Sequence, residues 1–424
     1  MVWPRVLVQS DRNKTIMFQA IIESWNDRLL RLAFLCIMLM GVAVASINPF
    51  QSVIGVEQLG FSRLAYAAIT TSGALLSVAA SVYVGIITDQ TGRYRDVLLR
   101  CNIVGIAAGA CVFVLPSKAT FILAHVVLFP IGATTFTQYF AMASLAASNN
   151  KALDKDVSLS LVRAAFAGAF GLTPPLIAVA VAGGMALTSV YGFAALMNCA
   201  VLILVLRTWP GDQTALSTQS GISFFAALRE LAEASVLVRL VLIAVLIGVN
   251  ALYNILLGLL ILNNLGGVAA DVGWFAGGVA LVEAPIMLLV AMALRHISRS
   301  AMLLLGAIIY CGFFGVLAAM PTMQVAWPMI IPAGIGAGIL LSVTVGYVQD
   351  LVAARPGAGS SLVSVSHFGG TMFASAVFAG GAAFTGYQGT AWLGCALGLG
   401  AGVLLFILDG ARIRPQGQEA TAAK

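Results

Sequence analysis

The sequence predicts an all-α membrane protein with twelve transmembrane helices arranged as two six-helix bundles. Hydrophobic residues make up 60% of the 424-residue chain and charged residues only 9%, whereas a soluble protein carries roughly 25% charged residues. Apolar runs long enough to cross ~30 Å of hydrocarbon as a helix recur along the whole length. The ~10-residue segments of alternating polarity that are typical of membrane β-barrels are not found.

Twelve apolar segments follow one another along the chain. They span 29–50, 64–88, 97–115, 119–143, 157–183, 188–206, 237–262, 270–294, 301–320, 325–349, 359–384 and 389–409. A polar stretch separates the first six from the last six, and near-equal halves of this kind are common in transporters, whose substrate site lies between the halves. The predicted organisation is a cytoplasmic N-terminal segment (1–28), a first bundle (29–206), a cytoplasmic linker (207–236), a second bundle (237–409) and a cytoplasmic tail (410–424).

The distribution of positive charge predicts the orientation. With twelve spans, both chain ends lie on one side of the membrane. The N-terminal segment, the even-numbered loops and the tail contain almost all of the 22 Lys and Arg residues, whereas the opposite loops contain only Arg63 and Lys118. The positive-inside rule therefore places both termini in the cytoplasm, and we expect a multi-pass protein of a bacterial inner membrane. This loop bias explains the net charge of +6 better than nucleic-acid binding does.

The charged stretch GIITDQTGRYRD lies in the predicted cytoplasmic turn between the second and third spans. Gly85 favours the close approach of a neighbouring helix, and Gly92 permits the positive φ of a tight turn. Asp89 lies at a helix C-terminus, which disfavours an anion. Its positive partners are expected to be Arg93 and Arg95, or the exposed amides of another helix N-terminus.

The same stretch resembles the G-x-x-x-D-x-x-G-R-x-[RK] signature of the major facilitator superfamily, at the loop where that family carries it. The resemblance implies the major facilitator fold. It also implies that Asp89 contacts the start of the eleventh span, PGAGSSL (356–362), whose serines suit helix capping. Such a contact would latch the two halves together on the cytoplasmic side in the outward-facing state. The alternative is a solvated turn that only anchors the orientation.

The second half contains an incomplete copy of this motif, ALRHISRS (293–300), with Arg295 and Arg299 but no acid or glycine. Asp350 ends the tenth span, where the helix dipole again disfavours a negative charge. We predict that Asp350 pairs with Arg295 or Arg299 and contributes to the conformational latch.

Other stretches resemble the sugar efflux transporter group within the superfamily. They are MGVAVASINPF (40–50), VRAAFAGAFGLTPPL (162–176), VEAPIM (282–287) and VQDL followed by PGAGSSL. The resemblance implies export of sugars in exchange for protons. GAFGLTPP (168–175) also resembles the glycine- and proline-rich motif that antiporters of the superfamily carry in the fifth span, which favours export. Leu256 departs from the acidic residue that some members carry in the seventh span. The 22 Phe and 14 Met residues keep the export of drugs or other amphiphiles as the alternative function.

Ionisable side chains inside the spans are candidates for proton coupling, because a charge at mid-membrane costs about 2.5–3.5 kcal/mol. Glu283 lies near the middle of the eighth span, Arg163 about two turns into the fifth, and His367 in the eleventh. If Arg163 and Glu283 met across the central cavity, protonation of Glu283 would release Arg163 and couple proton and substrate movement. The alternatives are a structural ion pair, an Arg163 that reaches the interface with its long stem, and a packing role for His367.

Amide side chains are candidates for binding the substrate. Asn250 and Asn254 are four residues apart and share one face of the seventh span, with Tyr253 adjacent. Amides hydrogen-bond sugar hydroxyls, and an aromatic ring stacks on the apolar face of a sugar. Each single amide can instead form an interhelical hydrogen bond. The further substrate-binding candidates are Asn48, Gln51 and Gln138.

No pattern in the sequence indicates a catalytic residue, a cofactor or a metal site. The three histidines are scattered, and no paired-acid motif occurs. The six cysteines lie inside apolar segments and form no C-x-x-C pair. We therefore expect a transporter rather than an enzyme, in contact with the lipid bilayer and monomeric by default. Its expected ligands are a small sugar-like molecule and protons.

Overall fold

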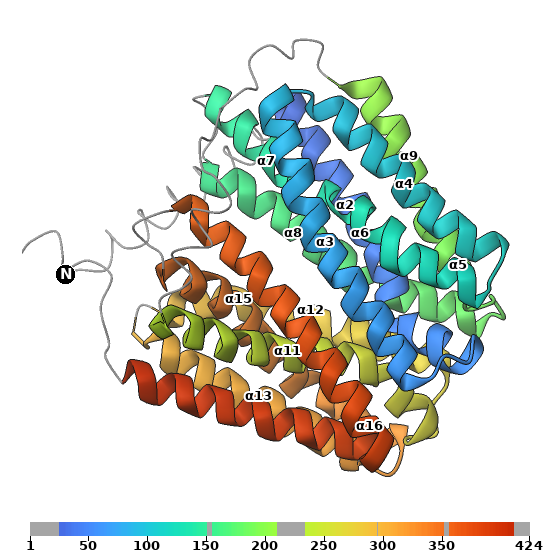
Figure 1. Cartoon of the computed structure of the whole chain (residues 1–424), viewed down its shortest axis with the longest axis vertical. Helices are drawn as coiled ribbons and strands as arrows, with labels where there is room; N and C mark the ends of the chain where they lie inside the picture. Colours follow the sequence, from blue (N-terminus) through green and yellow to red (C-terminus); the bar gives the residue numbers. More distant parts are fainter. Residues whose placement is uncertain (1–24, 151–154, 210–233, 295, 352–355, 411–424) are drawn as a thin grey trace, which may run out of the picture.

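A computed structural model describes residues 25–150, 155–209, 234–294, 296–351 and 356–410, and this part of the chain is helical (Figure 1). Within it, eleven helices are long and apolar enough to cross a membrane. The first 24 residues, most of the predicted linker and the tail after Gly410 lie outside the described residues.

The first six predicted segments correspond to helices between Arg28 and Thr208. These are α2 (Arg28–Ile47) with its 3₁₀ extension η1 (Asn48–Phe50), α3 (Arg63–Thr91), α4 (Tyr94–Val114), the series α5 (Lys118–Ile122), η3 (Leu123–Leu128), α6 (Phe129–Ala133) and α7 (Thr135–Asn149), then α8 (Lys155–Ala182) and α9 (Ser189–Thr208). A π-helical segment, η2 (Val53–Gln58), follows η1. The fourth predicted segment is divided because the π turn η3 and Pro130 interrupt the regular α-helical hydrogen bonds.

The second half repeats this arrangement. They are α11 (Ala234–Asn263), α12 (Ala269–Ala293), α13 (Arg299–Ala319), α14 (Met323–Ala326), η4 (Trp327–Met329), α15 (Ile330–Leu351) and α16 (Pro356–Asp409). The last two predicted segments form the two arms of α16, which breaks at Gly386 with φ 68° and ψ −173°. Only glycine adopts this backbone readily. The second arm is one of the eleven membrane-crossing helices, and the first arm is not among them.

Sequence signals at several helix ends form the expected caps. The Asp27 carboxylate accepts a hydrogen bond from the Leu30 amide at 2.9 Å, and the hydroxyls of Ser62 and Ser298 cap α3 and α13 in the same way. Such caps satisfy amides that have no partner within the helix. Gly92 ends α3 with φ 63°, which confirms the predicted tight turn.

The helices form two groups, one from each half of the chain (Figure 1). Between the groups, α8 packs against α12, α3 packs against α16, and η1 packs against α11 and α12. Small residues allow the close approach: a Cβ atom at Gly277 of α12 would meet the Pro175 ring of α8, and one at Gly273 would meet the Pro174 carbonyl. We call the end of the bundle where α2 begins and α16 ends the terminal end. The far end carries η2 and the break at Gly386.

Candidate functional site

The two halves are joined near the far end by contacts between α3 and α16. The hydroxyl oxygens of Thr70 and Ser375 are 2.8 Å apart. One turn closer to the far end, the Tyr66 ring meets the Phe378 ring edge-on, with 6.0 Å between centroids. Both rings are buried, so this contact excludes solvent between the halves.

Further contacts extend this seam to the surface of the far end. The Arg63 guanidinium lies 4.7 Å from the centre of the Tyr387 ring, a favourable cation–π geometry. Asn263 at the end of α11 donates a hydrogen bond to the Glu57 carboxylate at 3.0 Å. We call these contacts, together with the Thr70 and Tyr66 pairs, the far-end seam.

Asn48 and Gln51 lie beside this seam, at the end of α2 where η1 packs against α11 and α12. Both side chains are half-buried, and within the described part of the chain neither forms a hydrogen bond. Phe50 between them is fully buried and lies against Gly273 of α12. The two amides are therefore available to a ligand, and their role in substrate binding stays a prediction.

The predicted amide face of α11 is present. The Asn254 amide donates to the backbone oxygen of Asn250 at 3.0 Å and approaches its side-chain oxygen at 3.3 Å. The Asn250 amide donates in turn to the Tyr310 hydroxyl on α13 at 2.8 Å. Both asparagines are half-buried. The three polar groups thus form one continuous row from α11 to α13.

Tyr253 points away from any exposed surface. Its side chain is 4% exposed, and its ring packs edge-on against Phe313 and Phe314 of α13 at centroid distances of 5.6 and 5.7 Å. Its hydroxyl is buried and has no hydrogen-bond partner in the part of the chain that the structure describes. In this structure the ring has no free face on which a sugar could stack.

Gln138 forms an interhelical hydrogen bond, which is the alternative predicted for each single amide. It is 4% exposed, and its amide donates to the Thr88 hydroxyl at 3.3 Å, which connects α7 to α3. Thr88 donates to the Val84 carbonyl at 2.6 Å. This amide stabilises the packing of the first half in the observed structure.

Arg163 and Glu283 are not brought together. Arg163 is exposed, and its guanidinium lies 5.9 Å from the centre of the Phe140 ring on α7. Glu283 is half-buried on α12 and forms no hydrogen bond or ion pair with any described residue. Since Gly171 of α8 contacts Leu281 of the antiparallel α12, Arg163 lies more than one turn closer to the terminal end than Glu283.

The histidines differ in their surroundings. His367 is exposed on α16, and its carbonyl accepts a hydrogen bond from the Thr371 hydroxyl at 3.1 Å. The His125 imidazole Nε2 lies 2.7 Å from the Tyr191 hydroxyl, and its ring packs against Phe121 at a centroid distance of 4.2 Å. His125 is therefore part of the aromatic core, while a coupling role for His367 stays a prediction.

The structure describes only some residues of the predicted latch around the second and third spans. Arg93 is exposed and Arg95 half-buried, and the Nε atom of Arg95 has no hydrogen-bond partner among the described residues. The side chains of Asp89 and of the PGAGSSL stretch lie outside the described residues, so their contact stays a prediction. Among the described residues, a Cβ atom at Gly85 would have no neighbour within 4 Å, so the expected close approach of another helix at Gly85 stays a prediction.

The predicted partner of Asp350 is confirmed. Its carboxylate lies 2.6 Å from the Arg299 guanidinium, and this ion pair connects the end of α15 to the start of α13. The other predicted partner, Arg295, lies outside the described residues. The Arg299 guanidinium also lies against Gly346, where a larger side chain would displace it.

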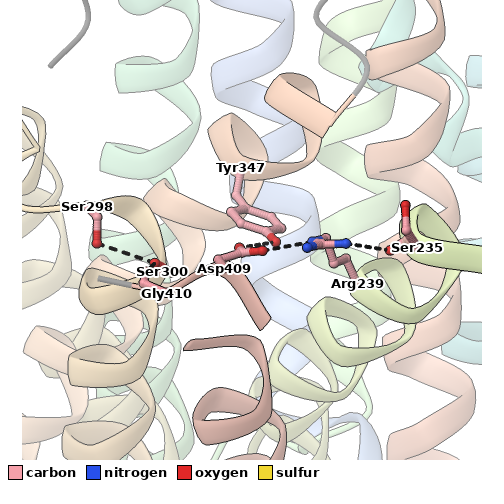
Figure 2. Close-up of polar contacts among 7 residues, drawn as sticks. All are labelled: Ser235, Arg239, Ser298, Ser300, Tyr347, Asp409 and Gly410. Atoms are coloured by element: carbon pink, nitrogen blue, oxygen red, sulfur yellow. Dashed lines mark hydrogen bonds and ion pairs between the residues drawn. The ribbon is translucent and has the colours of Figure 1, made fainter. Parts of the chain in front are cut away.

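A second polar cluster at the terminal end was not anticipated (Figure 2). The Asp409 carboxylate accepts a hydrogen bond from Arg239 at 2.8 Å and another from the Tyr347 hydroxyl at 2.6 Å. Arg239 also donates to the Ser235 carbonyl, and Ser300 donates to the Gly410 carbonyl. We call Arg239, Tyr347 and Asp409 the terminal triad. It connects α11, α15 and α16. The sequence shows charges at helix ends here, but not which of them meet.

Comparison with known proteins identifies distant relatives over most of the chain. The putative sugar efflux transporter of Deinococcus radiodurans is 24% identical over 378 residues, which cover 88% of this chain and 96% of that protein. Sugar efflux transporter A of Escherichia coli is 25% identical over 352 residues, 80% of this chain and 86% of that protein. No protein-family model matches the chain.

Solved structures show the same fold. The nucleoside transporter NupG superposes with a TM-score of 0.73 at 13% identity, over 91% of this chain and 99% of that chain. The peptide transporter POT in complex with sulfate superposes with a TM-score of 0.73 at 13% identity, over 92% and 96%. The chain therefore has the fold of major facilitator superfamily transporters. It is a multi-pass membrane protein and a distant homologue of sugar efflux transporters, and the proteins it resembles are transporters, not enzymes.

Proposed function

We propose that this protein exports sugars or similar small polar molecules in exchange for protons, by alternating access between its two halves. The observation that carries the proposal is the similarity to a putative sugar efflux transporter across 88% of the chain. That match includes both halves, between which transporters of this architecture bind their substrates.

The far-end seam supports a mechanism of alternating access. With both termini in the cytoplasm, as the loop charges favour, the far end faces the periplasm. The Thr70–Ser375 and Tyr66–Phe378 contacts then close the periplasmic side. Toward the terminal end, Cβ atoms at Gly85 and Gly168 would have no neighbour within 4 Å among the described residues. This arrangement suits a state that accepts substrate from the cytoplasm.

The row of amides on α11 supports a polar substrate. Asn250 and Asn254 are half-buried, and their donors and acceptors can exchange partners with the hydroxyls of a sugar. We include Asn48 and Gln51 in the substrate-binding set because their side chains, beside the seam, form no hydrogen bond with a described residue. Five of the phenylalanines, by contrast, are fully buried in the protein core: Phe50, Phe121, Phe275, Phe314 and Phe378. This weighs against an amphiphile as the principal substrate.

Glu283 is our candidate for the proton-coupling acid. A carboxylate within a membrane-spanning helix is costly without a partner, and Glu283 forms no hydrogen bond or ion pair with a described residue. Proton binding removes this cost, so occupancy by a proton changes which arrangement of the halves is favoured. Arg163 becomes its partner, in this proposal, when α8 and α12 approach each other at the terminal end.

Efflux measured in inside-out vesicles tests the proposal. Labelled sugars are supplied outside vesicles with an acidic lumen, so that outward proton flow drives sugar inward. We expect Glu283→Gln to lose gradient-driven accumulation while retaining exchange of labelled for unlabelled sugar. Asp271→Asn is the matched control, because Asp271 lies at the exposed start of α12, where it accepts a hydrogen bond from the Val268 amide at 2.8 Å.

Three outcomes would contradict parts of this proposal. Unchanged gradient dependence in Glu283→Gln removes this residue as the coupling acid. Wild-type vesicles that accumulate no sugar remove the substrate class. Accumulation of lipophilic cations in place of sugars identifies the alternative, an exporter of drugs or other amphiphiles.

A further inference from the structure

Four phenylalanines and one arginine gather on α7 and α8 in the first half. The Phe136 ring meets the rings of Phe140 and Phe166 edge-on, with 5.0 and 5.2 Å between centroids. The Phe166 ring lies 6.0 Å from that of Phe170, and the Arg163 guanidinium lies 5.9 Å from the centre of the Phe140 ring. All four rings are half-buried, and Arg163 is exposed. We call these five residues the cation–aromatic cluster.

Arg163 and Phe170 lie on the side of α8 that faces away from lipid. Leu172 and Val179 are 59% and 56% exposed, as expected of large apolar side chains on the lipid side of a membrane-spanning helix. Nine residues of an α-helix make two and a half turns. Arg163 lies nine residues before Leu172, and Phe170 lies nine residues before Val179, so the members of each pair are on opposite sides of α8. The cluster is therefore directed into the protein.

The second half does not cover α8 at the level of this cluster. A Cβ atom at Gly171 of α8 would lie 3.6 Å from the Leu281 side chain of α12. Ala164 lies seven residues before Gly171, which places it on the same face of the helix, two turns closer to the terminal end. Ala164 is nevertheless exposed, so among the described residues nothing covers this face there. The neighbouring Arg163 is thus accessible to a ligand that enters from the terminal end.

The amide row of α11 lies at the level of the cluster. A Cβ atom at Gly41 of α2 would meet the backbone oxygen of Phe166, and one at Gly258 of α11 would meet that of Pro49. Pro49 is eight residues beyond Gly41 toward the far end, which is about 12 Å along a helix. Asn250 is eight residues before Gly258, about 12 Å back toward the terminal end. Asn250 and Phe166 therefore lie at about the same height in the two halves.

The amide row also faces the first half. Asn254 lies four residues before Gly258, and residues four apart share one face of a helix. Because Gly258 meets Pro49 of the first half, Asn254 is directed toward that half as well, and its amide donates to Asn250. Amides from the second half, and a cation with aromatic rings from the first half, therefore border the same space.

The cluster has the chemistry of a site for an anion. A charge inside a membrane-spanning helix is costly without a compensating group, and Arg163 forms no hydrogen bond or ion pair with a described residue. A guanidinium binds a carboxylate or a phosphate through two parallel hydrogen bonds, and surrounding rings that exclude water strengthen the attraction. The same positive charge repels a lipophilic cation.

We propose that the substrate is an anionic sugar, whose carboxylate or phosphate binds Arg163 while its hydroxyls bind the amide row of α11. The Phe140 ring positions the guanidinium, and the other half-buried rings of the cluster exclude water from the ion pair. The inference rests on the proposed function of this protein and narrows its substrate class. It gives Arg163 a ligand in the observed arrangement, in which Glu283 lies more than one turn away along the bundle.

Equilibrium binding to the full-length protein in lipid nanodiscs tests the inference. The probes are glucose, glucuronate and glucose 6-phosphate at constant ionic strength, and isothermal titration calorimetry measures their affinities. We expect the wild type to bind at least one of the two anionic probes about tenfold more tightly than glucose, a difference of ~1.4 kcal/mol. The anion that binds more tightly identifies carboxylate or phosphate as the group that Arg163 recognises.

Variants of the cluster should change this preference in a graded way. Arg163→Gln should abolish it, and Arg163→Lys should retain part of it, because lysine keeps the charge but lacks the planar fork. Phe140→Leu should reduce the preference about two- to fivefold, as expected for the loss of one cation–π contact. Arg207→Gln is the matched control, since it removes an exposed arginine at the end of α9, and it should keep the wild-type preference. The ratio of affinities is compared within each variant, so that a general loss of folding affects all probes alike.

Two results would overturn the inference and leave sugar export in place. In the first, the wild type binds glucose as tightly as both anionic probes. In the second, Arg163→Gln keeps the wild-type ratio of affinities. A wild type that binds none of the three probes would refute the proposed sugar substrate as well. Export of an anionic sugar that does not depend on the proton gradient would leave the inference standing and refute only the proton coupling.

Discussion

The hydroxyls of Thr70 and Ser375 lie 2.8 Å apart and connect the first half of the chain to the second through α3 and α16. The two residues are 305 positions apart in the sequence. Each hydroxyl can donate or accept a hydrogen bond. The pair therefore stabilises the closed seam, and breaking it when the halves separate costs little free energy. A short hydrogen bond of this kind suits a contact that must break in every transport cycle.

Removing this bond should open the far end more often. One hydrogen bond contributes roughly 1 kcal/mol. Thr70→Val should therefore raise the fraction of molecules that are open at the far end about fivefold. The readout is the alkylation rate of Val53→Cys in a background without the native cysteines, because Val53 is 2% exposed beside the seam. Thr137→Val is the control, since the Thr137 hydroxyl, among the described residues, donates to the Thr134 carbonyl of the first half and to no group of the second half. Equal alkylation rates in Thr70→Val and wild type would refute the role of the pair.

A methyl group added at Gly277 should force α8 and α12 apart. Its Cβ would meet the Pro175 ring and the Gly171 carbonyl, and overpacking of this kind costs typically 1–3 kcal/mol. We expect Gly277→Ala to lower both the transport rate and the thermal unfolding temperature. Gly312→Ala on α13 is the matched control, because a Cβ there has no neighbour within 4 Å. Similar losses in both variants would show that the close approach at Gly277 is unimportant.

The ion pair between Arg299 and Asp350 should matter more for transport than for stability. The two side chains are 25% and 58% exposed, and exposed pairs contribute about 0.2–1 kcal/mol. Asp350→Asn should therefore reduce transport while membrane insertion and unfolding temperature stay close to those of the wild type. The exchanged pair Arg299→Asp with Asp350→Arg should recover part of the activity. Full transport in Asp350→Asn would rule out a function for the pair.

The terminal triad should contribute to the stability of the second half. Asp409→Asn leaves Arg239 without its ion-pair partner, and both side chains are only about one-fifth exposed, at 20% and 22%. We expect a loss of about 1–3 kcal/mol in the free energy of unfolding, measured by thermal denaturation in detergent. Tyr347→Phe, which removes one hydrogen bond but no charge, should cost less. A larger effect of Tyr347→Phe would contradict this account.

Gly92 offers a test of the turn that follows α3. Its φ of 63° is left-handed, and this conformation costs an L-residue roughly 1–2 kcal/mol. Gly92→Ala should therefore lower the unfolding temperature. Gly85→Ala should not, because the position is open and alanine favours a helix. If the two variants unfold at the same temperature, strain at this turn is not what selects glycine.

The positions of the membrane-spanning helices followed from the residues alone, and their ends only approximately. Hydrocarbon thickness and the need to satisfy every backbone group act on any apolar segment regardless of its neighbours. The described helices therefore correspond to the predicted segments, with the last loop reduced to Gly386. The Arg299–Asp350 pair was also predictable, since the two charges end adjacent helices and few other charges are near.

Which helix covers which side chain was decided only by the tertiary structure. A helical period shows that Asn250 and Tyr253 are neighbours, but not that α13 buries the Tyr253 ring while Asn250 bonds Tyr310. The sequence likewise placed Arg163 and Glu283 inside membrane spans, but it did not show that they lie at different heights along the bundle axis. Packing between helices depends on residues hundreds of positions apart, and in a transporter it differs between two arrangements of the same chain.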